Sequence, residues 1–587
     1  MIGRKMIGKN KMIISARADG LGERFLSLFN ALYLSKVTGL KFGYMWLSNF
    51  SYVQSDLCSN GIRRNEGMDI EHDVNLFSSD FIQNFKIKND SLLNDDGTVF
   101  THSPGSFVCC KTYSLDIFKG DSEYQWGWSS TSFDLSRLFN EIDCEDYYDY
   151  NYNIFNNFSK NFSSEIREAM LFANTIANSK LNNNFISIHV RCGGIVYEHR
   201  TEAIYGYKKA VPVHMVIDLI KQFGSEVNIV LFGDDILTLR QIVLFLNNPK
   251  NIYVADDFIK DLNYNSSQIT FFDIVLMSKS NQIFSSGKSA LSILASRISG
   301  KKNDINISIY KYIDKYDQYN TINRYLNILD VHKLQKSFSL FYIYTLSKEL
   351  NFDISITKKY IKDAIILDPD NIYYKIKFLH ILLIEKKYAE ADNYLGNLLN
   401  QNSGLFFNLF FYKKHEVLGF CFMNYEVFNA FYDIPKEFLT DNFILMCFNI
   451  YKEIIDIDIS KIVYGYEELK IIIDFKYNIF LDKVLNFYQY KNCIKIFNQK
   501  YPTLSYKIGY LFLNKNLKFS FIKKIFFLIS IINFHKENNK IFLDYFNNQN
   551  FNDRYFKFGQ SLIKAHKSWH KGGYVKLFFK ICKLKKG

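Results

Sequence analysis

Residues 185–194, Phe-Ile-Ser-Ile-His-Val-Arg-Cys-Gly-Gly, join the pattern of a buried strand to groups that could do chemistry. Apolar and β-branched residues lead directly to His189, Arg191 and two glycines. In an α/β protein this pattern places a cation at the carboxyl edge of the sheet, where ligands bind. A guanidinium can hold a diphosphate through two parallel hydrogen bonds, and glycines let the backbone turn sharply beside it. The plainer interpretation, that Arg191 pairs with a carboxylate at a strand end, is equally open.

Polar residues also follow the other strands predicted between residues 180 and 315. The hydrophobic pattern predicts strands over 185–190, 228–233, 251–255 and 281–285, separated by helices over 212–223, 235–246 and 289–299. Such alternation predicts a parallel sheet with helices on both faces. After the later strands come Asp234 and Asp235, Asp256 and Asp257, and then Ser285, Ser286, Lys288 and Ser289. These residues are candidate ligand contacts or, alternatively, ordinary turn residues.

The first region, about residues 10–165, contains a strand–turn–helix pattern. Residues 11–16 predict a strand, Gly20 and Gly22 a turn, and apolar residues from Phe25 to Tyr33 recur at helical spacing. This unit places backbone N–H groups at a helix N-terminus, which favours anion binding. The rest of the region is rich in aromatic residues, Asn and Asp, and predicts a loop-rich sheet domain that could hold an acceptor.

Two familiar nucleotide motifs are excluded by single residues. A Walker P-loop that ends at Lys288 and Ser289 would require glycine at position 282, where Gln282 stands. A dinucleotide fingerprint that begins at Gly20 would require glycine at position 25, where Phe25 stands. The sequence therefore supports neither ATP hydrolysis nor NAD binding. We expect no cofactor and no metal site, because the D-x-D at residues 456–458 falls in a predicted helical region.

Composition narrows the class of protein further. The chain has 587 residues, 48% of them hydrophobic, which is enough for two to four domains with sizeable cores. Its net charge of +13 is spread along the chain and fits an anionic ligand or membrane surface, while no nucleic-acid-binding signature is present. The nine cysteines are irregularly spaced without a C-x-x-C pair, which predicts reduced thiols. With no signal-peptide pattern and no apolar run of membrane-spanning length, the expected location is the cytoplasm.

The third region, about residues 325–587, is predicted to be α-helical. Residues 360–399 resemble one tetratricopeptide repeat, with Ala364, Pro369, Asn371 and Ala391 at its characteristic positions. One repeat does not define a solenoid, so a helical appendage that covers the sheet or mediates oligomers is equally open. The lysine-rich and apolar tail, residues 562–586, predicts peripheral contact with an anionic membrane or, alternatively, a solvated terminus.

In their order and spacing, four of these segments resemble the bacterial fucosyltransferase group, whose superfamily includes α-1,2- and α-1,6-fucosyltransferases and protein O-fucosyltransferases. The likeness covers about residues 12–305 and rests on residues 20–24, 189–191, 232–235 and 273–297. It implies a GT-B-like pair of Rossmann-like domains and an inverting, metal-independent glycosyltransferase. The implied donor is a GDP-linked sugar, fucose or a related one, and the implied acceptor is a bacterial surface glycan or lipopolysaccharide, free or lipid-linked.

The resemblance also implies roles for single residues. Arg191 would hold the β-phosphate of the donor with His189 beside it, and Asp234, next to Asp235, would lie near the base or ribose. The diphosphate would meet the hydroxyls and helix N-terminal amides of Ser285, Ser286 and Ser289, with Lys288 either adding charge or simply solvated. Gly20, Gly22, Glu23 and Arg24 would approach the sugar or the acceptor. The general base is open between Glu198, His199 and Glu23, and the segment around Glu198 also fits a solvated loop.

The chain departs from the family pattern at the acidic residue of its H-x-R-x-G-D motif, which is Gly194 here. The family asparagine after G-L-G is Glu23, and its S-D-D element is residues 233–235, Gly-Asp-Asp. These departures leave the donor sugar open. They also leave a second hypothesis open, a non-catalytic scaffold whose helical repeats bind a partner and whose α/β half is a degenerate nucleotide-sugar domain.

Overall fold

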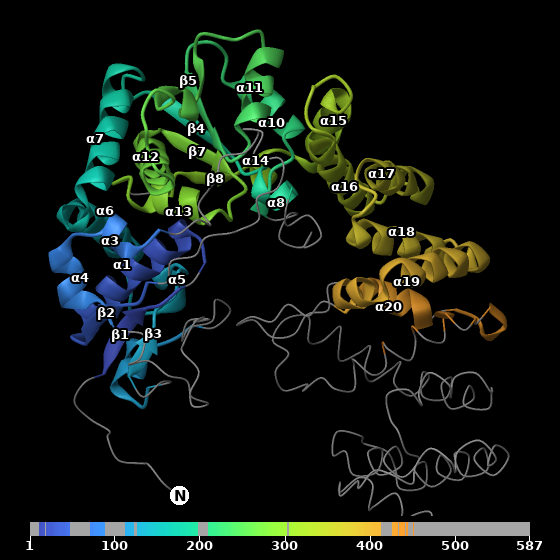
Figure 1. The fold of residues 1–587 in the computed structure, drawn as a ribbon, viewed down its shortest axis with the longest axis horizontal. Helices are drawn as coiled ribbons and strands as arrows, with labels where there is room; N and C mark the ends of the chain where they lie inside the picture. The colour runs from blue at the N-terminus through green and yellow to red at the C-terminus, as the bar shows by residue number, and fades with distance from the viewer. Residues whose placement is uncertain are drawn as a thin grey trace, which may run out of the picture. The chain divides into compact units, whose positions relative to one another are not determined.

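The computed structural model of the chain describes residues 11–17, 19–46, 71–87, 112–122, 126–197, 209–301, 304–411 and much of 425–450. Within this part the protein is α/β, as predicted, with two entirely parallel sheets and many helices (Figure 1). The described residues up to Phe378 form one compact unit, and those from Leu379 onward form a second. This division does not test the predicted domain boundaries at 165, 180, 315 and 325, which stay a prediction.

The first sheet has the strand order β2-β1-β3, built from Met12–Ser15 (β1), Lys41–Tyr44 (β2) and Gly127–Ser129 (β3). Helix α1, Leu21–Thr38, follows β1 as predicted and ends where Gly39 adopts a left-handed conformation with φ +73°. Gly39 fits there because glycine enters this region without a Cβ penalty.

The expectation of a loop-rich sheet domain after residue 40 is wrong for the described residues. Apart from the short strands β2 and β3, most of them are helical: α3 (Asp73–Leu76), α4 (Ser79–Phe85), α5 (Leu135–Leu138), α6 (Cys144–Phe158) and α7 (Ser164–Ser179). The missed signals are the N-caps of the last four helices, since the side chains of Ser78, Asp134, Asp143 and Ser163 each accept a backbone N–H of the first turn.

The second sheet has the strand order β6-β5-β4-β7-β8. Its strands are Phe185–Val190 (β4), Asn228–Gly233 (β5), Ile252–Val254 (β6), Gln282–Ser285 (β7) and Asn306–Ser308 (β8). The first four confirm the predicted strands to within one residue at each end. The predicted helices are confirmed as α10 (His214–Gln222), α11 (Ile236–Phe245) and α13 (Ala290–Arg297). Helix α12, Ser266–Lys279, was not predicted, because it is buried almost all round and shows no amphipathic stripe.

The strand order creates a switch point between β4 and β7. From β4 the chain moves outward through β5 and β6, then returns through α12 to place β7 on the opposite side of β4. Helices α7, α12 and α13 cover one face of the sheet, and α10 and α11 lie on the other (Figure 1). In open parallel sheets the crevice at such a switch point is where ligands bind.

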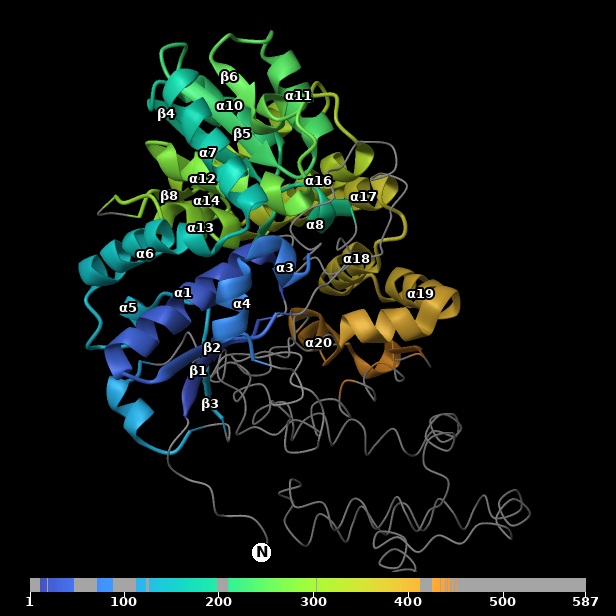
Figure 2. The ribbon, with the colours of Figure 1, turned by 60° about the vertical axis from the view of Figure 1, so that its left-hand side comes forward.

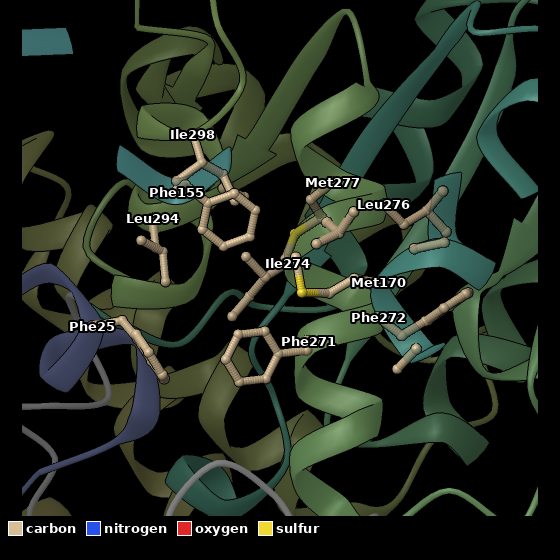
Figure 3. Packing of buried hydrophobic residues seen from close by; sticks show 14 of the residues in the cluster. Phe25, Phe155, Met170, Phe271, Phe272, Ile274, Leu276, Met277, Leu294 and Ile298 are labelled. Atoms are coloured by element: carbon tan, nitrogen blue, oxygen red, sulfur yellow. The ribbon is translucent and has the colours of Figure 1, made fainter. Parts of the chain in front are cut away.

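The two sheets share one hydrophobic core. Helix α1 of the first sheet packs on α12 and α13 of the second, and Phe25 faces Phe271 and Leu294 in this core (Figure 3). The rings of Phe25 and Phe271 meet edge to face with their centroids 5.1 Å apart. A buried polar chain adds to the junction, because Arg297 of α13 donates to the Tyr147 hydroxyl, which in turn donates to Asn30 of α1. The first sheet is therefore held against the second through α1 and α13.

Helices follow the second sheet, as predicted from residue 325 onward. In the first unit these are α14 (Ile309–Tyr312), α15 (Lys315–Tyr325), α16 (Lys333–Glu349) and α17 (Ile354–Leu367), with α16 and α17 packed as a pair (Figure 2). Helix α18, Ile372–Ile384, crosses into the second unit, which also contains α19 (Tyr388–Phe410) and α20 (Tyr425–Tyr432). In the described part of the chain, no helix combines the length and apolar character needed to cross a membrane. The lysine-rich tail, residues 562–586, and residues 456–458 lie outside the described residues.

Candidate functional site

Strand β4 carries His189 into the protein interior. All six residues of β4 are buried. Side chains alternate along a strand, so His189 lies on the same face as Phe185, which packs in the core with α7 and α12. Burial, and then the nearby charge of Arg191, lower the pKa of His189 to about 4. The imidazole is therefore neutral at physiological pH, and its Nδ1 has no hydrogen-bond partner among the described residues.

Arg191 lies just past the end of β4 and is half-buried. Its backbone carbonyl accepts the Val211 N–H at 3.1 Å, which fixes the start of the turn. No carboxylate of the described residues lies within ion-pair distance of its guanidinium. The described part of the chain thus gives no support to a simple strand-end ion pair. Glu198 and His199, two of the three candidate bases, lie outside the described residues.

The turn after Arg191 is built around the carboxylate of Asp234, which follows the neighbouring strand β5. Asp234 accepts the backbone N–H groups of Cys192, Gly193 and Gly194 at 3.0, 2.6 and 2.9 Å. Only glycine fits at 193, because a Cβ there would lie 2.5 Å from the Asp234 Cγ. Three successive N–H groups of this kind otherwise form a cradle for an anion. Here the protein supplies the anion itself, so we assign Asp234 to the turn in place of the expected nucleotide contact.

Asp235 has a similar internal role. It is fully buried and caps α11, accepting the Thr238 N–H at 3.0 Å and the Thr238 hydroxyl at 2.6 Å. It also accepts the Tyr197 hydroxyl and the side-chain amide of Gln335, the latter at 2.9 Å. Burial, followed by the charge of Asp235, raises the pKa of Tyr197 far above its usual range. Both aspartates are thus matched to donors of the protein.

The serine-rich segment after β7 faces the N-terminus of α13. Ser285 donates to Asn306 of β8 at 2.7 Å and accepts the Gly287 N–H at 2.9 Å, while Ser286 accepts the Lys288 N–H at 3.3 Å. Ser289 stands at the N-cap position of α13, yet its hydroxyl caps no backbone N–H. This hydroxyl is buried and has no partner among the described residues.

Gly287 permits this segment to turn back beside β8. Its φ of +76° lies in the left-handed region, and a Cβ would come 2.8 Å from the Ser308 Cβ. Lys288, next in the chain, is exposed.

Gly22 brings the first sheet to the same place. A Cβ on Gly22 would lie 2.7 Å from the Ala290 carbonyl carbon, so the first turn of α1 rests directly on the first turn of α13. The two helices lie side by side in both views (Figures 1 and 2). Gly20 occupies the N-cap position of α1 without a side chain to cap it. Two helix N-termini, each with positive dipole character, therefore meet here.

Arg24 and Glu23 occupy the first turns of α1. Arg24 is buried with its guanidinium over the Trp46 ring at 5.1 Å, and its Nε donates to the Asp19 carbonyl at 2.6 Å. Burial lowers the pKa of Arg24 to about 10, so the group keeps its charge at neutral pH. Glu23 is partly exposed and is the one candidate base within the described residues. Arg17, beside these groups, pairs with Asp19.

The strand register brings Arg191 and the predicted serines to one edge of the sheet. Ile188 of β4 pairs with Phe284 of β7, so the Arg191 turn and the Ser285–Ser289 segment leave neighbouring strands at the same edge. One guanidinium, two helix N-termini and serine hydroxyls together favour an anionic ligand. Asp234 and Asp235 lie toward β5, on the other side of β4.

The sequence did not predict two sets of hydrogen bonds. Asp234 anchors the turn after Arg191, and Gln335 of α16 donates to Asp235. No local pattern signals Gln335. The paired glycines at 193 and 194 signal a tight turn, but not its partner. Among the described residues, no three His, Cys, Asp or Glu side chains are grouped as metal ligands. No protein-family model matches the chain, and no curated protein matches it in sequence.

Proposed function

We propose that the chain is a glycosyltransferase that moves a sugar, fucose or a related one from a GDP-linked donor, to a bacterial surface-glycan or lipopolysaccharide acceptor. The observation that carries this proposal is the group of anion-binding elements at the switch point between β4 and β7. Arg191, the N-terminus of α13 and the first turn of α1 meet there, and ligands of open parallel sheets bind at such points. A nucleotide diphosphate matches the charge of these elements.

In this proposal the protein assists the reaction by stabilising the departing diphosphate. Arg191 holds the β-phosphate in a bidentate contact, while the Ser289 hydroxyl and the first N–H groups of α13 receive the developing negative charge. These groups do the work that a divalent cation does in metal-dependent transferases. His189, held neutral by its lowered pKa, offers the phosphate a hydrogen bond without adding charge.

The proposed displacement is inverting, and one bond forms as another breaks. The acceptor hydroxyl attacks the anomeric carbon, the bond from that carbon to the diphosphate oxygen breaks, and the hydroxyl proton passes to a general base. Glu23, at the first turn of α1, is the described candidate for this base, beside Glu198 and His199. Glu23 would receive the proton on a carboxylate oxygen while the nucleotide diphosphate leaves with the electron pair.

The remaining sequence-based expectations belong to the same proposal. Two lobes with parallel sheets support a GT-B-like arrangement, and the successive helices α16 to α19, with Ala364 and Ala391 fully buried, support a tetratricopeptide-like region. We place the protein in the cytoplasm, with the tail at residues 562–586 in peripheral contact with the membrane that bears a lipid-linked acceptor.

The second candidate function is that of a non-catalytic scaffold. The contacts of Asp234 favour it. Three N–H groups of the turn bind Asp234, so these groups are not open to the phosphates of a donor. The two candidates differ in one observable respect: a transferase releases nucleotide from its donor, whereas a scaffold does not.

The test is thermal denaturation with GDP, UDP and CMP compounds, followed by a donor screen that measures nucleotide release. A bound ligand raises the apparent stability by mass action, so we expect GDP to stabilise the wild type and not Arg191→Ala. Arg240→Ala is the matched control, because it removes a surface arginine of α11 that pairs with Asp257. Stabilisation by no nucleotide would contradict the proposal, and nucleotide release that requires Mn²⁺ would contradict the metal-independent step.

A further inference from the structure

Helix α16 reaches the Arg191 turn through one buried side chain. The Gln335 amide nitrogen lies 2.6 Å from the Cys192 carbonyl oxygen, 2.9 Å from an Asp235 carboxylate oxygen and 3.1 Å from the Tyr197 hydroxyl. Gln335 is fully buried. It is separated from Cys192 by 143 positions in the sequence, so only the tertiary fold brings the two together.

The orientation of this amide follows from its neighbours. Cys192 presents a carbonyl oxygen and Asp235 a carboxylate, and both are acceptors only, so the group that faces them must be the NH₂. The opposite orientation would place the amide oxygen against two acceptors. Gln335 therefore acts as a donor that ties the turn after β4 to the N-cap of α11. Its own oxygen has no hydrogen-bond partner among the described residues.

Apolar contacts hold α16 in this position. Helix α8, Gly194–Tyr197, directly follows the Arg191 turn and packs against α16. Ile195 and Val196 are buried in one cluster with Phe338 of α16, and Leu334 packs against it. The rings of Tyr197 and His332 meet edge to face at 5.3 Å. The turn is thus fixed on one side by Asp234 and on the other by α16.

We propose that Gln335 is a positioning residue for Arg191, so that α16 is a working part of the donor site and not an appendage. The inference rests on the proposed function. Asp234 fixes the N–H groups of the turn, but the Cys192 carbonyl needs a donor of its own, and Gln335 supplies it. With both contacts in place, the Arg191 side chain starts from a fixed backbone at the switch point. Without the donor, the turn can rotate about the Asp234 contacts and carry the guanidinium away from the diphosphate.

The first test compares Gln335→Leu with Ser337→Ala in the full-length chain. Ser337 lies on the same helix, is also buried, and donates at 2.8 Å to the Ala364 carbonyl of α17, so it is a matched control with no contact to the turn. We expect Gln335→Leu to speed amide hydrogen exchange in residues 190–197 at least tenfold and to weaken GDP binding at least tenfold. Ser337→Ala should leave both quantities within twofold of the wild type, even where it lowers the melting temperature.

The second test measures how GDP binding by Gln335→Glu depends on pH. It also tests the proposal if Gln335→Leu does not fold. The groups that face the substituted carboxyl are Asp235, Tyr197, the Cys192 carbonyl and, at the start of α16, His332. At pH 8 two carboxylates would oppose each other, so GDP binding should be weakest. At pH 5.5 a protonated carboxyl can donate to Asp235, and binding relative to the wild type at the same pH should recover at least fivefold.

The outcomes separate the two proposals. Unchanged exchange in residues 190–197 of Gln335→Leu, or equal changes in Ser337→Ala, would overturn the positioning role whatever the wild type binds. A second outcome is that the exchange rates of the two variants differ as expected, but the wild type binds none of GDP, UDP, CMP compounds and inorganic pyrophosphate. Gln335 then still holds the turn, but the proposed function fails. Faster exchange with unchanged GDP affinity would show that the turn does not need to be fixed for binding, and would also overturn the proposal.

Discussion

The two sides of strand β4 differ in whether the protein supplies partners for the candidate site residues that lie there. Toward β5, Asp234 and Asp235 accept donors from the Arg191 turn, from α11 and from α16. Toward β7, the Ser289 hydroxyl at the start of α13 is buried without a partner among the described residues, and in β4 itself the His189 Nδ1 is too. Buried polar groups of native proteins are nearly always hydrogen-bonded. The Gln335 amide oxygen on the first side also lacks a partner among the described residues, but both carboxylates of that side accept several donors of the protein. We infer that the first side is structural and that the second is where a ligand completes the set.

The largest effect expected from this comparison is that of Arg191→Ala on transfer. Loss of the half-buried Arg191 guanidinium at the switch point should lower kcat/KM about 1,000-fold, or about 4 kcal/mol, as for other groups that stabilise charge in a transition state. Stability should change little, because Arg191 holds no carboxylate of the described residues. Nucleotide release and urea denaturation measure the two quantities.

Arg240→Ala should keep the transfer rate within about twofold, since surface ion pairs contribute little. An Arg191→Ala enzyme with nearly normal turnover would show that the β7 side does not bind the diphosphate. A strongly destabilised one would show that Arg191 belongs to the structural side instead.

Asp234→Ala should have the largest effect on stability. It leaves three buried N–H groups without their acceptor, which should cost about 3 kcal/mol of unfolding free energy in urea denaturation. Asp257→Ala, which removes an exposed carboxylate of a surface pair, should cost less than about 0.5 kcal/mol. Equal stability of the two variants would mean that the β5 side is not held together by Asp234.

The sequence predicted the parts of this comparison that depend on local pattern. Strands β4, β5 and β7 follow from short apolar runs, and α13 from an apolar face and a serine-rich start. The role of Asp234 depends on bonds to residues 40 to 42 positions earlier, and that of Gln335 on a bond across 143 positions. Helical periodicity and propensity carry no information on such contacts, which arise only when β4, β5 and α16 are packed together.

The candidate site was predicted in the same uneven way. Arg191, Ser285, Ser286 and Ser289 follow strands that proved adjacent, because polar residues after parallel strands share one edge of the sheet. Asp234 and Asp235 follow a strand equally well, yet both are used within the protein. The aspartates differ from Arg191 and the serines in the number of hydrogen-bond partners that the fold brings to each side chain. A pattern of residue types does not predict this number.

His189 makes stability depend on pH. Its pKa is about 4 in the folded protein, against 6.5 as the ordinary value, so between these values the unfolded chain binds the proton more readily. This contribution of His189 to stability is fully present above pH 6.5 and is lost as the pH is lowered toward 4, by about 3 kcal/mol at most. His214, with its pKa lowered by burial to about 3, acts in the same direction.

Urea denaturation at pH 7.5 and pH 5 checks this expectation. Between pH 7.5 and pH 5, His189→Asn should lose less stability than the wild type. The part of the loss that comes from His214 should be the same in the variant and in the wild type. A wild type whose stability is the same at pH 5 and 7.5 would show that the imidazole already finds a proton acceptor in the protein. In that case His189 would not be one of the groups left for a ligand.

The smallest effect expected is also the one that sharpens the comparison most. Ser289→Ala removes a buried hydroxyl that bonds to nothing in the described protein, so stability should be unchanged within about 0.5 kcal/mol, while GDP binding should weaken five- to tenfold, about 1 kcal/mol. Ser292→Ala removes a neighbouring hydroxyl that donates to Ser285 and to the Ser289 carbonyl, and should cost about 1 kcal/mol of stability. If Ser289→Ala is destabilised as much as Ser292→Ala, its hydroxyl is satisfied within the folded chain. The two sides of β4 would then be equally closed, and the reason to place a ligand beside β7 would be lost.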